Sequence, residues 1–198
     1  MAWLTVPEAI DAWNERGRLY LPGDSLHPDD PLKKELPMTA RSLTVTWQDP
    51  MQMAQSARNM AGIDFLRGVR DGTIQPAPIQ ELIGMKLMEV EPGRAVWEVV
   101  PAEQHYNPIG TVHAGVAATL LDSAMACAVH LSIPLGKGYT TLEFKINLVR
   151  AVTIKSGALR AIGRVVHGGK TTATAEARLE DASGALYAHA TTTCIIIG

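Results

Sequence analysis

Cysteine is scarce in this sequence. The chain of 198 residues contains two cysteines, Cys127 and Cys194, and each lies inside an apolar stretch. There is no paired-cysteine motif and no H-E-x-x-H motif, so the sequence indicates no metal site. Free cysteines are usually buried and inert, which favours two such thiols in a reducing compartment. We therefore expect no metal and no bound cofactor.

An excess of charge of either sign is also missing. The sequence has 18 Lys and Arg and 20 Asp and Glu residues, for a net charge of −2 and a pI near 6.3. This balance lacks the basic footprint of a protein that binds nucleic acid or an anionic membrane. The stretch MAWLTVPEAIDAW has neither a basic segment nor a long apolar run. We expect no signal peptide, no membrane span and a cytoplasmic location.

Two common catalytic loops are absent as well. No G-x-S-x-G nucleophile elbow occurs in the chain. The stretch GKGYTT has two glycines at the spacing of a dinucleotide-binding loop, but it lacks the third and precedes a strand pattern. We interpret it as a turn, because that loop requires a helix after it.

The composition changes near residue 50. Residues 1–50 are rich in prolines and charges, with one helix predicted at TVPE by its capping-box spacing, and we assign this extension no role. Residues 51–198 are predicted to form the folded domain. The pattern of residues 49–72 predicts one or two amphipathic helices ending at Gly72, and TIQPAPIQELIG predicts a linker and a short helix.

The pattern becomes more regular from Gly84 onward. MKLMEVE and RAVWEVV, on either side of Pro92-Gly93, predict a hairpin, and a long apolar helix follows. Four strand patterns come next: YTTLEFKINLV, IKSGALRAIGRVV, TTATAEARLED and ALYAHATTTCIII. In the first of them Leu142, Phe144, Ile146 and Leu148 share one face. This order predicts an α+β domain in which an antiparallel sheet wraps around one helix.

The apolar helix contains one unexpected residue, Asp122. An ionised carboxylate is costly to bury, so its presence points to a function. Pro108 and Gly110 predict that the helix begins near Thr111 or Val112, where free N–H groups and the helix dipole can hold a developing oxyanion. Asn107 and His113 flank this end, either as donors to a ligand or as an ordinary turn residue and a capped histidine.

The spacing of these residues resembles that of a known family. The order N-P-x-G-x-x-H-x-G, followed by an Asp within a long apolar helix, is similar to that of hotdog-fold acyl-CoA thioesterases of the phenylacetic-acid-degradation (PaaI-like) type. The similarity continues through LLDSAMACAVH, GYTTLEFKINLVR and GGKTTATAEARLED, and it covers about residues 55–197. It implies a hotdog fold and an enzyme that hydrolyses acyl-CoA, with coenzyme A as part of the substrate.

The resemblance also implies roles for individual residues. Asp122 corresponds to the carboxylate that activates water or attacks the thioester, and the Ala114 N–H to the oxyanion donor. Asn107 and His113 would shape the pocket, and Thr141 (or Thr140) would hold water. Residues expected to contact the CoA portion are Gly115, Arg150, Arg164, His167, Gly169 and Lys170, although Lys170 also fits an ordinary hairpin charge.

One departure from the family pattern is Ala114, where a glycine is usual. Alanine accepts the negative φ of a helix start without strain, so its N–H stays available while its methyl narrows the acyl space.

Two other functions are known for proteins of this fold, and the sequence argues against them to different degrees. A hotdog hydratase is disfavoured because no Asp-x4-His occurs in the chain. A non-catalytic acyl-CoA sensor remains open, although residues 1–50 show no basic DNA-binding module.

Helix geometry predicts a shared site. Ala114 and Asp122 are eight residues apart, so their backbones lie about 12 Å apart on a helix. One chain cannot easily place both groups on the same carbonyl, whereas a two-fold dimer can pair Ala114 of one subunit with Asp122 of the other. We expect a homodimer with shared active sites, assembling further into a homotetramer.

Overall fold

The computed structural model describes residues 40–198. The helix predicted at TVPE lies outside the described residues. Thr44–Gly198 forms one compact unit, which contains every helix and strand described below. Within the described part of the chain, no helix is long and apolar enough to cross a membrane.

Among the described residues, three helices precede the sheet: α2 (Pro50–Asn59), α3 (Gly62–Asp71) and α4 (Pro78–Ile83). The Asp49 carboxylate caps α2 by accepting a hydrogen bond from the Met51 N–H at 2.9 Å. α3 ends at Gly72, whose φ of 75° suits glycine. The predicted pair of helices ending at Gly72 and the short helix before Gly84 are therefore confirmed.

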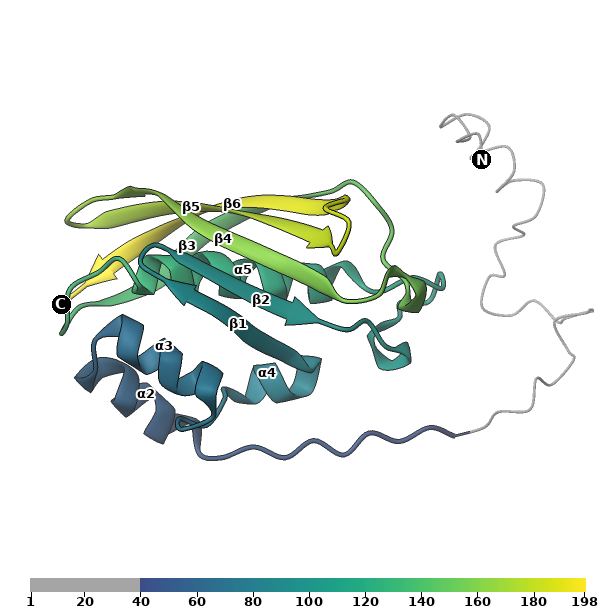
Figure 1. The fold of residues 1–198 in the computed structure, drawn as a ribbon, viewed down its shortest axis with the longest axis horizontal. Helices are drawn as coiled ribbons and strands as arrows, with labels where there is room; N and C mark the ends of the chain where they lie inside the picture. Colours follow the sequence, from purple (N-terminus) through teal and green to yellow (C-terminus); the bar gives the residue numbers. More distant parts are fainter. Residues whose placement is uncertain (1–39) are drawn as a thin grey trace, which may run out of the picture. The chain divides into compact units, whose positions relative to one another are not determined.

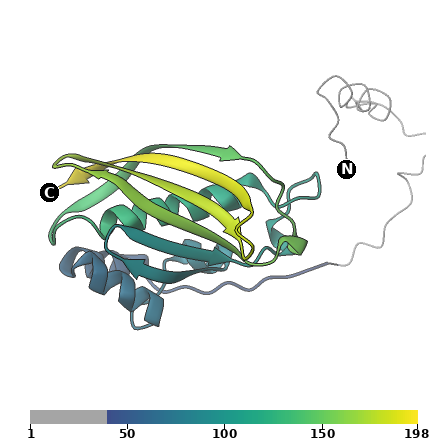
Figure 2. The ribbon, with the colours of Figure 1, turned by 45° about the horizontal axis from the view of Figure 1, so that its top comes forward.

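The sheet has six antiparallel strands in the order β1-β2-β4-β5-β6-β3 (Figure 1). Their bounds are Met85–Glu91 (β1), Arg94–Val99 (β2), Gly138–Leu148 (β3), Leu159–Gly168 (β4), Thr172–Asp181 (β5) and Leu186–Ile197 (β6). Short 3-10 turns occupy Glu103–His105 and Ile154–Ser156. All the predicted strands and hairpins are present, but the strand predicted from Ile154 begins at Leu159, because Ile154–Ser156 forms one of these turns. The sheet curves around the long helix α5 (Ala114–His130), which confirms the hotdog fold (Figure 2).

Helix α5 begins later than the sequence predicted. Val112 belongs to an isolated bridge with Tyr106 and donates its N–H to the Val152 carbonyl at 2.9 Å. These bonds hold Val112 in extended backbone, and His113 becomes the N-cap. The predicted start at Thr111 or Val112 was wrong, because contacts with residues distant in the sequence extend the preceding loop.

Small residues allow α5 to lie close to the sheet. The buried positions of β5 and β6 are largely alanines: Ala173, Ala175, Ala177, Ala188 and Ala190. On β4, a Cβ at Gly163 would collide with the backbone carbonyl of Ala124 in α5. The closest helix–sheet contact therefore depends on glycine at position 163.

Replacing Gly163 with alanine should lower the free energy of unfolding by about 1–3 kcal/mol, the usual cost of overpacking a core. The obstacle is helix backbone, which cannot turn aside as a flexible side chain can. Urea unfolding followed by circular dichroism measures the change. Gly168→Ala on the same strand is the matched control, because a Cβ there meets no atom within 4 Å. Equal stability of the two variants would contradict this account of the packing.

Strand β3 lies at the edge of the sheet and pairs with β6 alone. The register shifts between Thr141 and Glu143, so Leu142 is the extra residue of a bulge and leaves the apolar face on which the alternation placed it. Phe144 and Leu148 are 38% and 51% exposed. Much of the apolar face predicted for this strand is therefore uncovered within one chain.

Candidate active site

The N-terminus of α5 is shaped by His113. Its Nδ1 accepts a hydrogen bond from the Gly115 N–H at 2.9 Å, so the side chain caps the helix. In a neutral imidazole this bond assigns the ring proton to Nε2, which remains free to donate. A Cβ at position 115 would lie 2.9 Å from Nδ1 of His113, so the cap also requires glycine there.

Asn107 organises the loop before this helix. Its side-chain oxygen accepts hydrogen bonds from the N–H groups of Ile109 and Thr111 at 3.0 and 3.1 Å. Its Nδ2 donates to the Thr111 hydroxyl at 2.9 Å. Asn107 is thus a turn residue in this chain, and one N–H of its amide is left for a ligand.

The first N–H groups of α5 differ in their partners. The Gly115 N–H is bound by His113, and the Val116 N–H donates to the His113 carbonyl at 3.0 Å. Within residues 40–198, no hydrogen-bond acceptor is found for the Ala114 N–H. Ala114 is exposed, so its N–H is the one best placed to meet a ligand oxygen at this helix end.

Asp122 lies in the middle of α5, where it is half-buried and faces β3. The Thr141 hydroxyl donates a hydrogen bond to its Oδ1 at 3.1 Å. Burial raises the pKa of the Asp122 carboxyl, and the bond from Thr141 acts in the opposite direction. The bond fixes the orientation of one carboxylate oxygen, and burial makes the carboxylate more basic.

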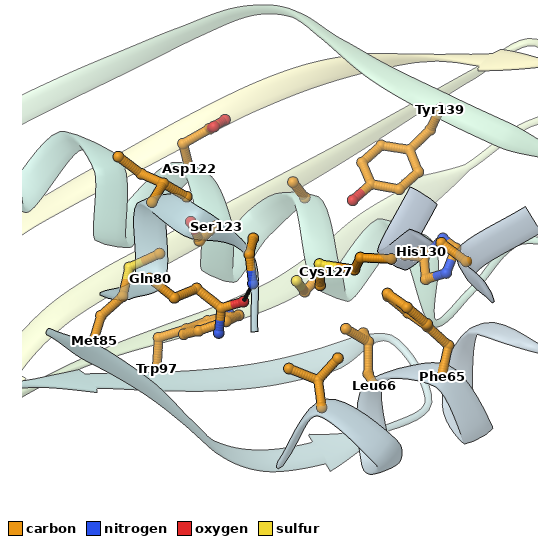
Figure 3. Close-up of a pocket in the computed structure, with 16 residues that line it drawn as sticks. Phe65, Leu66, Gln80, Met85, Trp97, Asp122, Ser123, Cys127, His130 and Tyr139 are labelled. Atoms are coloured by element: carbon orange, nitrogen blue, oxygen red, sulfur yellow. Dashed lines mark hydrogen bonds between the residues drawn. The ribbon is translucent and has the colours of Figure 1, made fainter. Parts of the chain in front are cut away.

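One face of α5 borders a largely apolar cavity of about 260 Å³ (Figure 3). Five of its lining residues fall on a single helical face, at positions 122, 123, 126, 127 and 130. Helices α2, α3 and α4 form the opposite wall, with side chains that include Phe65, Leu66 and Gln80. A carboxylate with raised basicity therefore borders a space suited to an apolar part of a ligand.

The predicted site residues lie in separate places in the structure. Asn107, His113, Ala114 and Gly115 meet at the start of α5, while Asp122 and Thr141 meet midway along it. Arg150 is exposed, and its guanidinium lies 5.4 Å from the centre of the Tyr187 ring.

The other residues predicted to contact CoA lie elsewhere. Arg164, His167 and Lys170 are exposed and Gly169 is partly exposed, on β4 and its turn into β5. The Ile196 N–H joins this turn to the C-terminal end of β6 by donating to Thr171. That end of the sheet is where β3 begins and α5 ends (Figure 1). One chain therefore does not bring these residues to the start of α5.

Sequence reasoning missed most of the cavity wall. Trp97 and Tyr139 fit ordinary strand patterns, and His130 fits the apolar helix, so none of them stands out in the sequence. His130 is eight residues after Asp122 and therefore near the same face of α5, so this spacing could have identified it. Nothing in the sequences of α2, α3 and α4 indicates that these helices cover the cavity. In the described part of the chain, no three His, Cys, Asp or Glu side chains cluster as metal ligands do.

Comparison with known proteins gives consistent results. A family model described as the thioesterase superfamily matches residues 109–188. A 1,4-dihydroxy-2-naphthoyl-CoA hydrolase of Listeria monocytogenes is 30% identical over 103 residues, which cover 52% of this chain and 82% of that protein. The chain belongs to the thioesterase superfamily.

Solved structures agree with this assignment. A thioesterase family protein from Silicibacter pomeroyi is 25% identical, with a TM-score of 0.58 over 74% of this chain and 99% of that one. The PaaI protein of the Escherichia coli phenylacetic acid degradation operon is 20% identical, with a TM-score of 0.60 over 67% of this chain and 94% of that one. At that identity the second likeness supports the fold alone.

Proposed function

We propose that this protein hydrolyses acyl-CoA thioesters to a free acid and CoA. The observation that carries the proposal is Asp122, a half-buried carboxylate of raised pKa that borders an apolar cavity. Membership of the thioesterase superfamily and similarity to a naphthoyl-CoA hydrolase support the same reaction. The cavity would hold the acyl group and place its thioester near Asp122.

Asp122 can act in either of two ways. As a general base it takes a proton from water, and the resulting hydroxide attacks the thioester carbon. As a nucleophile it attacks that carbon itself, and water then hydrolyses the mixed anhydride. In both routes the C–S bond breaks and CoA leaves as a thiolate that is then protonated. Thr141 orients the carboxylate through its bond to Oδ1.

The oxyanion formed in this attack needs a donor, and we assign that role to the Ala114 N–H with the His113 Nε2–H beside it. Backbone N–H groups at a helix start are fixed before the reaction, so they stabilise the transition state without reorganising. Ala114 and Asp122 are eight residues apart in α5, which corresponds to about 12 Å along the axis. We therefore propose that the donor and the carboxylate of one site come from two subunits.

The edge strand supports such a dimer. β3 has one unpaired edge, and its Phe144 and Leu148 side chains are substantially exposed. Unpaired strand edges with apolar side chains are normally covered by another element. A second copy docked there lies beside Thr141 and Asp122, where its own helix start can complete the site. The predicted CoA contacts at Arg150, Arg164, His167, Gly169 and Lys170 belong to the same proposal.

A panel of acyl-CoAs tests the reaction itself. With no metal added, the purified protein should release free thiol from at least one aryl- or medium-chain acyl-CoA, with kcat in the range of roughly 1–10³ s⁻¹ that enzymes usually show. A thiol-reactive dye follows the release continuously. Activity should be unchanged by a chelator. Activity lost with chelator and restored by zinc would contradict the metal-free mechanism, and no hydrolysis by the folded protein would contradict the proposal.

A further inference from the structure

The cavity is not uniformly apolar. Its wall includes Trp97 on β2 and His130 at the end of α5, whose buried ring nitrogens have no oxygen or nitrogen partner in the described part of the chain, and Tyr139 on β3 beside His130. We call these three residues the inner site. His130 lies eight residues beyond Asp122 in α5, so the two backbones are separated by about 12 Å. The inner site therefore meets the part of an acyl group that lies farther from the thioester.

The Tyr139 hydroxyl is the accessible member of the inner site. Figure 3 shows its ring reaching from β3 over the cavity, with the hydroxyl directed toward the middle. Within the described chain this hydroxyl has no hydrogen-bond partner, and it is not among the buried unpaired atoms, so it is open to the cavity. A phenol hydroxyl both donates and accepts, which suits either a hydroxyl or a keto oxygen of a ligand.

Two buried side chains, His130 and Trp97, line the same cavity as that hydroxyl. The His130 ring is 5.4 Å from the Tyr139 ring, is 9% exposed, and has no partner at either nitrogen within residues 40–198. The Trp97 side chain is 3% exposed, and its indole N–H has the weakly accepting Cys127 sulfur as its polar neighbour. Leaving buried donors unpaired is costly, so an oxygen atom bound here would remove that penalty.

The charge of the cavity wall and the volume of the cavity limit which acyl groups can bind. None of the described residues that line the cavity is Lys or Arg, and Asp122 is the acidic residue among them. A second carboxylate on the acyl group would be desolvated without a cation, which is strongly unfavourable. The volume of about 260 Å³ is small for a binding site, since whole-ligand sites span roughly 300–1,000 Å³. It fits a single ring or a short chain, with the CoA portion outside.

We infer that the inner site binds an oxygen atom carried by a compact, uncharged acyl group, and that Tyr139 and His130 determine this specificity. This inference rests on the proposed acyl-CoA hydrolysis and names its substrate class. The acyl oxygen exchanges hydrogen bonds with the Tyr139 hydroxyl first. The His130 ring, which lies 5.4 Å from the Tyr139 ring, is next to this contact. An acyl group without such an oxygen leaves these groups unpaired, and therefore binds less well.

Matched pairs of thioesters test the inference. The probes are phenylacetyl- and 4-hydroxyphenylacetyl-CoA, benzoyl- and 4-hydroxybenzoyl-CoA, and hexanoyl- and 6-hydroxyhexanoyl-CoA, with glutaryl-CoA as the charged case. The kcat/KM of the hydroxylated member should exceed that of its partner by about tenfold in at least one pair, as expected for one buried hydrogen bond. Glutaryl-CoA should be the poorest substrate. Tyr139→Phe and His130→Phe should each bring that ratio toward one.

The ratio of kcat/KM values within a pair distinguishes a loss of specificity from a general loss of activity, because a general loss affects both thioesters equally. Tyr187→Phe is the matched control, because Tyr187 is a buried tyrosine outside the cavity wall, and this variant should keep the wild-type ratio. Equal kcat/KM values within every pair would overturn the inference, with water then satisfying the inner site, and leave the proposed hydrolysis standing. If no thioester is hydrolysed, binding can be measured instead, as the increase in Tm of the Asp122→Asn variant that each thioester causes. The hydroxylated member of a pair should then cause the larger increase. Equal shifts would overturn the inference independently.

Discussion

The variant Asp122→Asn should fold normally and lose activity by about 10²- to 10⁴-fold in kcat, the usual contribution of a general base. Asparagine has nearly the same shape and can still accept the hydrogen bond from Thr141, so α5 keeps its contact with β3. The amide cannot take a proton from water and is a poor nucleophile. Thiol release from the best substrate measures the loss, and urea unfolding verifies that the variant is folded.

The pH dependence of the wild-type enzyme provides an independent check. Activity requires the carboxylate form of Asp122, so kcat/KM should fall as pH drops through its pKa. Burial raises that pKa, so the fall should lie at higher pH than for an ordinary aspartate. Asparagine has no carboxyl group to protonate, so this fall should disappear from the residual activity of Asp122→Asn.

The matched control is Asp64→Asn, which removes an exposed carboxylate in the first turn of α3 and should retain wild-type kcat. Wild-type turnover by purified Asp122→Asn would remove Asp122 from the mechanism. The non-catalytic acyl-CoA sensor would be the better interpretation only if the wild-type protein bound acyl-CoA without releasing thiol.

Much of the fold was predictable because local signals and tertiary contacts agree. The turns at Pro92-Gly93, HGGK and DASG bound strands where the sequence placed them. Predictions failed where distant segments decide the conformation. Val112 is held extended by Val152, and the bulge at Leu142 moves that residue off its alternating face. Neither partner can be identified from the residues next to it in the sequence.

The site was predictable to the extent that it lies on one helix. The order of Asn107, His113 and Asp122 follows a single segment, and the structure adds the bond from Thr141. The cavity wall was not predictable, because it requires knowing which helices cover the open face of α5. Aromatic and small residues in Gly62–Asp71 fit any amphipathic helix equally well, so only the packed structure shows that Phe65 and Leu66 face the cavity.

Mixing two inactive variants should restore about a quarter of wild-type activity if each site is shared between subunits. The variants are Asp122→Ala, which lacks the carboxylate, and Ala114→Trp, whose bulky side chain blocks the exposed helix start. Random pairing during refolding makes about half of the dimers mixed, and each mixed dimer has one site with both an intact Ala114 and an intact Asp122. Thiol release before and after co-refolding measures the recovery.

The controls fix the interpretation of that recovery. Each variant refolded alone should stay inactive, and affinity tags of two kinds on the variants should show that mixed dimers have formed. If each chain built its own site, no mixed dimer could contain an intact one, because every chain carries one of the two substitutions. Absence of recovery in proven mixed dimers would therefore place Ala114 and Asp122 of the same chain on one thioester. The roughly 12 Å between their backbones on α5 would then have to be bridged by other donors.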